Sequence, residues 1–243
     1  MKTNFLFMLT AVIFLVSGCR VRVGDGSVVL EPSKKVVKAE YPQKAFDKVE
    51  NHAVGNIQLV KSDTSMVTLS APENYIDLYE FKNNDGELDI SFAKKDVTIQ
   101  SANVKITVYT PNLHEVSNSG AADIHLTGLT TDGLKIRNSG VGSFLLKQVQ
   151  AKVIDVSCSG VGSISIDGQA DEAKYSCSGV GSIDAKDMKT LRVKAHVTGV
   201  GDIACHATEY LKGRVTGVGG LQYAGHPAKK DLHRTMTGGF KEL

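Results

Sequence analysis

A five-residue motif recurs six times between residues 119 and 220 at nearly constant spacing. The clearest copies read Ser-Gly-Val-Gly-Ser, and the others are variants of it. The first glycines of the copies lie 18 to 20 residues apart, at Gly120, Gly140, Gly160, Gly179, Gly199 and Gly217. A fixed period of this length is typical of solenoids, in which each coil packs only against its neighbours. The repeat therefore restricts the fold far more than it restricts the chemistry.

Aligning the copies on their first glycine separates apolar positions from polar ones. Positions two and four before the glycine, and four and six after it, are mostly apolar, as in the column Ile124, Phe144 and Ile164. Positions three and five before it are mostly polar. Because successive side chains of a strand point to opposite faces, each copy predicts an inward-facing strand on either side of a glycine corner. We expect an all-β solenoid of about 20 residues per coil, closed by a looser third side.

The glycines of the motif are predicted to be structural. A corner glycine accepts a positive φ or lets a neighbouring backbone approach closely, which a β-carbon would prevent. The alternative is a phosphate-binding loop, but such a loop precedes a helix, whereas every copy here enters a strand. The second glycines of the corners are Gly142, Gly162, Gly181, Gly201 and Gly219.

The N-terminus has the features of an export signal. Met1-Lys2 is followed by a mostly apolar run from Phe5 to Val16, and Ser17-Gly18 then precede Cys19. We expect residues 1–18 to be a lipoprotein signal peptide and Cys19 to be lipidated. An ordinary signal peptide with a chance cysteine and a transmembrane helix are the alternatives, although the run is short for a bilayer core of about 30 Å. We expect the protein to be anchored in the bacterial envelope at the outer membrane, on a face that the sequence leaves open.

The remaining chain divides into two parts. Residues 19–44 contain charges, two glycines and two prolines with little periodicity, so we expect a tether there. Residues 45–243 are predicted to form the β-helix domain. Upstream of the repeat, residues 46–49 and 53–59 are followed by residues 66–109, which alternate apolar and polar residues with a period of two and indicate strands. These upstream strands could add three or four further coils.

Two pairs of residues occupy one column, two positions before the first glycine. Cys158 and Cys177 should lie about 4.8 Å apart in neighbouring coils, which is inside the disulfide range. Parallel side chains make the disulfide torsion awkward, so we expect free buried thiols. Asn118 and Asn138 precede them in the column and predict a ladder of hydrogen-bonded amides.

A column of cations is the strongest candidate for a binding surface. It could recognise anionic glycans or lipid head groups, although solvated cations on an outer strand face are also common. Its members are Lys135, Arg137, Lys174, Lys194, Lys212 and Arg214.

Other chemistry is not indicated. The histidines lack metal-site spacing, and only two of the six corners carry an aspartate, so we expect no metal and no cofactor. The net charge of +2 gives no reason to expect nucleic acid as a partner. No Ser-His-Asp, Cys-His or paired-carboxylate pattern stands out, and we expect no catalytic activity. Polysaccharide lyases and hydrolases also use β-helices, but their clefts usually need long insertions and aromatic platforms, and this chain has no tryptophan.

The repeated corners, the opening Phe46-Asp47-Lys48-Val49 and the closing Tyr223-Ala224-Gly225-His226-Pro227 resemble a known family. These are bacterial envelope proteins that carry the putative auto-transporter adhesin, head GIN domain, and the resemblance covers roughly residues 46–240. It implies a right-handed, single-stranded parallel β-helix, export to the cell envelope and frequent lipid attachment. It also implies an adhesin-like or scaffold role, with a surface glycan or an envelope protein as partner. An envelope-stress sensing module is the alternative, and the oligomeric state, including a homo-oligomer, stays open.

Overall fold

The computed structural model describes residues 20–22, 28–94, 97–99, 103–235 and 238–243. The expected signal peptide, residues 1–18, and the expected lipidation site, Cys19, lie outside the described residues.

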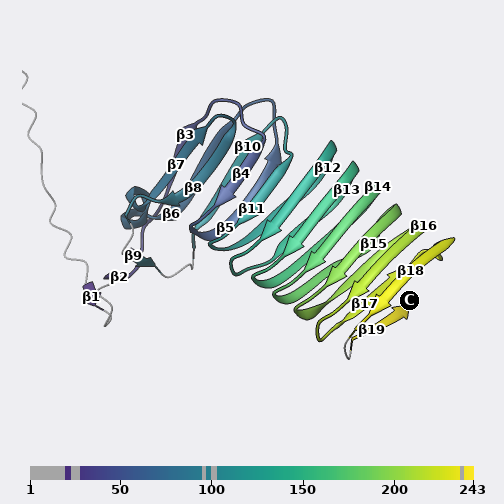
Figure 1. Ribbon diagram of the computed structural model, residues 1–243. Coiled ribbons are helices and arrows are strands. Elements are labelled where there is room, and N and C mark those ends of the chain that lie inside the picture. Colours follow the sequence, from purple (N-terminus) through teal and green to yellow (C-terminus); the bar gives the residue numbers. More distant parts are fainter. Residues whose placement is uncertain (1–19, 23–27, 95–96, 100–102, 236–237) are drawn as a thin grey trace, which may run out of the picture.

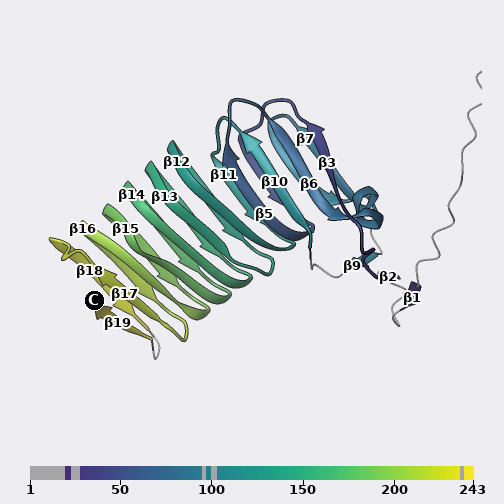
Figure 2. The ribbon, with the colours of Figure 1, turned by 180° about the vertical axis from the view of Figure 1, so that it is seen from behind.

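The second half of the chain is a parallel β-solenoid whose coils lie side by side from β12 to the C-terminal strands (Figure 1). Figure 2 shows the same order from behind. The expectation of an all-β fold with stacked coils of about 20 residues is confirmed. Its strands are β12 (Ala121–Asn138), β13 (Phe144–Cys158), β14 (Val161–Cys177), β15 (Val180–Val197), β16 (Val200–Val215), β17 (Gly220–Ala224), β18 (Lys229–Arg234) and β19 (Gly239–Glu242).

The register of the strands reproduces the alignment on glycine. Ile124 pairs with Phe144, and Phe144 pairs with Ile164. The coil that begins at Gly160 is one residue shorter than its predecessor, and the register shifts between Leu146 and Val149 to absorb the difference. Gln148 occupies the extra position with a φ of 55°, and its backbone N–H donates to Asp167 Oδ1 at 2.7 Å. A local bulge thus keeps the columns in line on either side.

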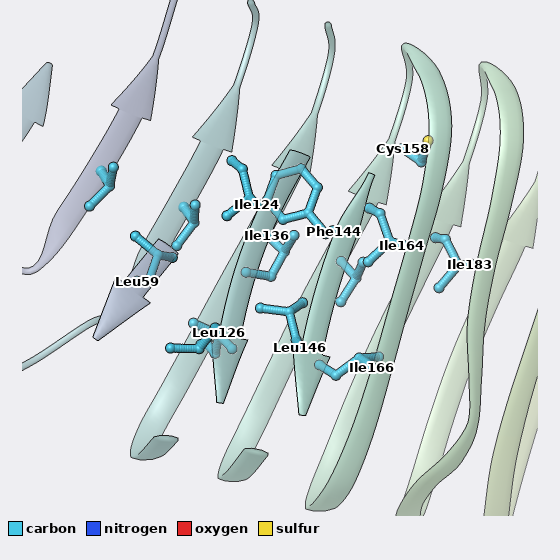
Figure 3. Close-up of a cluster of buried hydrophobic side chains, with 14 of the residues drawn as sticks. Leu59, Ile124, Leu126, Ile136, Phe144, Leu146, Cys158, Ile164, Ile166 and Ile183 are labelled. Carbon is cyan, nitrogen blue, oxygen red and sulfur yellow. The ribbon is translucent and has the colours of Figure 1, made fainter. Parts of the chain in front are cut away.

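The core is a set of stacked apolar columns inside the coils (Figure 3). Isoleucine, leucine and phenylalanine side chains of successive coils lie one above the next, so that Phe144 lies between Ile124 and Ile164. All three are at most 1% exposed. Like side chains therefore pack against like, which is how a repeat too small to form its own core buries its apolar face.

The N-terminal part begins the solenoid and also closes one end of it. Parallel pairing joins β4 (Lys48–Asn51) to β11 (Glu115–Asn118), and β5 (Val54–Lys61) to both β10 (Lys105–Thr110) and β12. β8 also pairs parallel with β4, whereas β3 pairs antiparallel with β6, β6 with β10, and β7 with β8. Their bounds are β3 (Val36–Pro42), β6 (Met66–Pro72), β7 (Tyr79–Asn84) and β8 (Glu87–Phe92).

The expectation of three or four further uniform coils in this part is therefore wrong. A period of two is the same in parallel and antiparallel strands, so it could not distinguish them. The 3₁₀ helix Glu73–Leu78 joins β6 to β7, and the rings of Tyr41 on β3 and Phe81 on β7 lie 4.7 Å apart at this end of the core. Antiparallel hairpins and aromatic side chains thus close the core where the solenoid begins.

The sequence predicts a tether over residues 19–44, but the structure places strands there. The short strands β1 (Arg20–Arg22) and β2 (Val28–Leu30) form a three-stranded sheet with β9 (Val97–Ile99). Strand β3 alternates exposed and half-buried residues along its whole length and pairs with β6. Its ending at Pro42 fits an edge strand, where a missing N–H is tolerated.

Candidate functional site

The glycine corners are packed too closely to bind a ligand. A β-carbon on Gly140 would overlap the carbonyl oxygen of Gly120, and one on Gly160 would overlap that of Gly140. The corner amides are also occupied, since the N–H groups of Gly140 and Val141 donate to Asn118 and Gly120 of the preceding coil at 3.0 and 2.9 Å. A phosphate loop needs free backbone donors. The glycine corners therefore hold neighbouring coils together through close packing and backbone hydrogen bonds.

The cation column is partly neutralised by three carboxylates from neighbouring coils, Glu115, Asp155 and Asp231. Lys135 and Arg137 both pair with Glu115, at 3.1 and 3.3 Å, and Lys174 pairs with Asp155 at 3.6 Å. Lys212 lies 3.7 Å from Asp231. Among the described residues, Lys194 and Arg214 are the members of the column that form no ion pair. Lys174, Lys194 and Lys212 lie in register in three consecutive coils, so this stretch keeps a net positive charge, although four of the six cations are held in ion pairs.

The column that contains Asn138, Cys158 and Cys177 is buried and structural. Asn138 Nδ2 donates to the corner carbonyl of Gly142 at 2.9 Å, and the Sγ atoms of Cys158 and Cys177 donate to Gly162 and Gly181 at 3.8 and 3.4 Å. Each of these side chains thus donates a hydrogen bond to the backbone carbonyl four residues later in the chain. Both cysteines are free, as expected. Amide and thiol share the column because both can supply this donor.

A contact between Ser119 and His52 was not foreseen from the sequence. Ser119 Oγ lies 2.5 Å from His52 Nδ1, and His52 Nε2 lies 3.4 and 3.5 Å from carboxylate oxygens of Glu50 and Asp89. These residues meet because β8, β4 and β11 are neighbours in the sheet, although 67 positions separate Ser119 from His52.

The composition of this cluster resembles a hydrolase triad, but its surroundings do not. Acyl transfer needs backbone donors aimed at the developing oxyanion. Next to Ser119, the N–H groups of Gly120 and Ala121 donate to the carbonyls of Asn51 and Ala53, at 3.1 and 3.0 Å. The exposed contact therefore joins two coils, and we assign it no catalytic role.

The third side of the coils is hollowed into a groove of about 760 Å³. It crosses successive coils at the same register position, because Thr130 pairs with Gln150, Gln150 with Gln169, and Gln169 with Lys189. It therefore runs along the solenoid axis. Its lining residues are Asn112, Leu113, His114, Thr130, Thr131, Asp132, Gln150, Ala151, Lys152, Gln169, Ala170, Asp171, Lys189, Thr190, Leu191 and Thr208.

Small side chains form the floor of the groove and longer ones form its two walls. The floor column is buried or half-buried and consists of Thr131, Ala151, Ala170 and Thr190. The neighbouring positions on either side are exposed, as the alternation of a strand requires. One wall, here called the amide wall, consists of Thr130, Gln150, Gln169 and Lys189. The other, here called the charged wall, consists of Asp132, Lys152, Asp171 and Leu191.

Charges along the groove nearly cancel. Lys152 Nζ lies 2.8 Å from Asp132 Oδ1, and this hydrogen bond lowers the pKa of Asp132 and raises that of Lys152. The carboxylate of Asp171 further raises the pKa of Lys152. Both members of the pair are exposed to solvent, so it contributes little to stability. The groove thus presents alternating charges at Asp132, Lys152 and Asp171 on one wall, and two neutral amides between Thr130 and Lys189 on the other.

No group of three or more histidine, cysteine, aspartate or glutamate side chains in the described part of the chain could hold a metal ion. Within the same residues, no helix is both long and apolar enough to span a bilayer.

Comparison with known proteins places the fold in a family. Residues 45–227 match the family described as "Putative auto-transporter adhesin, head GIN domain". A crystal structure of a putative adhesin from Bacteroides fragilis is 32% identical, with a TM-score of 0.81 over 87% of this chain and 99% of that one. The chain belongs to this family. Among the curated proteins compared with the chain, none matches.

More distant structures share the fold of this head GIN domain. A putative adhesin from Parabacteroides distasonis is 22% identical, with a TM-score of 0.67 over 86% of this chain and 97% of that one. A putative lipid binding protein from the same species is 19% identical, with a TM-score of 0.68 over 87% and 99%. The groove-lining residues lie inside the range that matches the family. Membership of an adhesin-like family indicates a cell-envelope or surface protein.

Proposed function

We propose that this protein is a lipid-anchored, adhesin-like protein of the bacterial envelope, and that the groove is its binding face. The main support is the availability of polar side chains in the groove. The groove repeats exposed polar side chains in successive coils, whereas the corner amides and most of the cation column are already paired within the protein. An extended face of this kind suits recognition of a long ligand, as in other solenoids.

Binding without catalysis is supported by the cluster around Ser119. Its neighbouring backbone donors are used between coils, so nothing there would stabilise an oxyanion. The family to which the chain belongs is also described as an adhesin.

The lipid anchor is tested through Cys19. In the native bacterium, Cys19→Ala should move the protein from the membrane fraction to the soluble fraction, because the acyl chains supply the membrane affinity. Cys205→Ala is the matched control, since Cys205 is buried in the solenoid and cannot carry a lipid. Unchanged membrane partition of the Cys19→Ala protein would refute the anchor.

The binding face is tested by obstructing the groove. Cells that lack the protein are complemented with the wild type, with the double variant Gln150→Arg and Gln169→Arg on the exposed amide wall, or with Val153→Arg, whose exposed position is absent from the groove lining. We expect the double variant alone to reduce attachment to surfaces and to other cells. Equal attachment of all three strains, with a changed envelope-stress response in the deletion, would support the sensing alternative instead.

A further inference from the structure

The geometry points to a linear, uncharged glycan as the ligand of the groove, lying parallel to the solenoid axis with about one sugar unit per coil. This inference rests on the proposed function and names the class of ligand.

The repeat of the groove fits a polymer. Coils stack about 4.8 Å apart, so each wall offers an equivalent side chain at that interval. A pyranose unit in an extended chain is of similar length, and a linear glycan can therefore meet one level of the groove with each sugar. From Asn112 to Thr208 the groove crosses six consecutive levels, which corresponds to a length of about 24 Å. A chain of about four or five sugars would fill it.

The chemistry of the walls fits hydroxyl groups. Gln150 and Gln169 are exposed and stand next to each other on the amide wall. Among the residues that the structure describes, none forms a hydrogen bond with either side-chain amide. Each amide offers two donors and an acceptor, and the carboxylates of Asp132 and Asp171 on the charged wall offer further acceptors. Paired hydroxyls of a sugar can engage both walls at once.

The charge balance argues against a polyanion or a polycation. Asp132 and Asp171 would repel successive negative groups, and Lys152, which lies between them on the charged wall, would repel positive ones. A ligand with a uniform charge would meet the wrong sign at every second coil. An uncharged ligand meets no such penalty.

The paired backbone argues against an extended peptide. Peptides are usually added to a sheet through an unpaired strand edge. In the groove, Gln150 lies between Thr130 and Gln169 in a continuous parallel ladder, and Gln169 in turn pairs with Lys189. The floor therefore has no free edge, and only side chains are available to the ligand.

Weak binding at each site is expected, because the described lining contains no phenylalanine, tyrosine or tryptophan on which a sugar could stack. Many anchored copies on one cell would compensate through multivalency. This is consistent with a role in attachment.

The test measures the dependence of affinity on ligand length. The full chain is purified in a detergent without a sugar head group and titrated with α-1,4- and β-1,4-linked glucose and mannose oligomers, from disaccharide to octasaccharide. Oligogalacturonides serve as the charged comparison, and an extended Ser-Thr-rich peptide serves as the polypeptide comparison. For at least one neutral series, affinity should rise with length up to about four or five units and then level off.

Substitutions in the amide wall provide a second test, in which the affinity for the neutral oligomer is measured. The double variant Gln150→Ala with Gln169→Ala should weaken binding of the neutral oligomer about tenfold or more, since each lost hydrogen bond changes affinity by a few-fold. Gln222→Ala is the matched control, because Gln222 is a half-buried glutamine outside the groove. Circular dichroism and thermal melting of every variant establish that the solenoid is intact.

Three results would overturn the inference: no binding of any neutral oligomer, tighter binding of oligogalacturonide, or tighter binding of the peptide. The proposed function fails separately. If the double variant Gln150→Arg with Gln169→Arg abolishes attachment while no neutral glycan binds, the groove is the binding face and the ligand class is wrong. If attachment survives in this double variant, the groove is not the binding face.

Discussion

The side-chain amide of Asn118 donates a hydrogen bond to the side-chain oxygen of Asn138 at 3.1 Å inside the core. Asn51 in the preceding coil donates to Asn118 Oδ1 at 2.8 Å, so three coils are joined by one ladder. All three asparagines are 1% exposed. Buried amides are stable only when they are paired, and this ladder pairs them across coils.

Replacing the middle residue should therefore be costly. Asn118→Leu leaves one N–H of the Asn51 amide without its acceptor, while the other still donates to the Ala53 carbonyl, and it leaves Asn138 Oδ1 without its donor. We expect a loss of about 2–4 kcal/mol in the free energy of unfolding. Urea denaturation followed by circular dichroism measures it. Asn112→Leu is the control, since Asn112 is exposed. A loss no larger than that of the control would contradict a stabilising ladder.

The ladder shows which parts of the fold could be predicted from sequence. Asn118 and Asn138 share a column once the copies are aligned on glycine, and the expected hydrogen bond is confirmed. Asn51 belongs to the same ladder but lies 67 residues before Asn118, with β5 to β10 between them. Asn51 lies outside the repeated segment, so its hydrogen bond with Asn118 could be found only from the structure.

The groove could not be predicted for a related reason. Thr130, Gln150 and Gln169 lie on the third side of the coil, where coil lengths vary and the register shifts between Leu146 and Val149. Alignment on glycine is least certain there. The cation column lies on the well-aligned side, but the ion pair of Lys135 with Glu115 shows why it is a weaker candidate.

Gly160 tests whether the corners require close approach. It has no unusual φ, but a β-carbon there would overlap the carbonyl oxygen of Gly140. Gly160→Ala should cost at least about 3 kcal/mol or prevent folding, because backbone atoms cannot move aside as a flexible side chain would.

Gly133→Ala is the matched control for Gly160→Ala. The nearest atom to a β-carbon at Gly133 is the carbonyl oxygen of Val153, at 4.0 Å. This substitution should leave stability unchanged or raise it by about 0.4–1 kcal/mol, since alanine restricts the unfolded chain. Thermal melting and yield of folded protein distinguish the two variants, and similar behaviour of both would refute the steric argument.

Cys158 and Cys177 should stay reduced and unreactive in the folded protein. They are 1% and 0% exposed, and each thiol donates a hydrogen bond to a corner carbonyl, Cys158 to Gly162 and Cys177 to Gly181. A thiol reacts as the thiolate and must be accessible. In the Cys19→Ala protein, a disulfide-exchange reagent should label the thiols only after denaturant is added. Rapid labelling of the native protein, or a disulfide found by mass spectrometry, would contradict this prediction.

Cys205 provides a prediction about alkaline pH. Burial raises the pKa of its thiol from 9.0 to about 12. In the unfolded chain the thiol ionises near its usual pKa. Above about pH 9 the unfolded state therefore releases this proton and is stabilised, whereas the folded state keeps the proton. The contribution of Cys205 to stability is therefore full below about pH 9 and falls as the pH rises towards about 12. Removing the thiol removes this part of the pH dependence.

Comparing wild type with Cys205→Ala isolates the effect, because every other ionisable group is common to both proteins. The cavity left by the substitution lowers stability by a similar amount at each pH. Between neutral pH and about pH 10.5, wild type should lose about 2 kcal/mol more than Cys205→Ala, as expected for a thiol that ionises only when unfolded. Urea denaturation at the two pH values measures this difference. Equal losses in the two proteins would show that the thiol ionises as readily in the folded solenoid as in the unfolded chain.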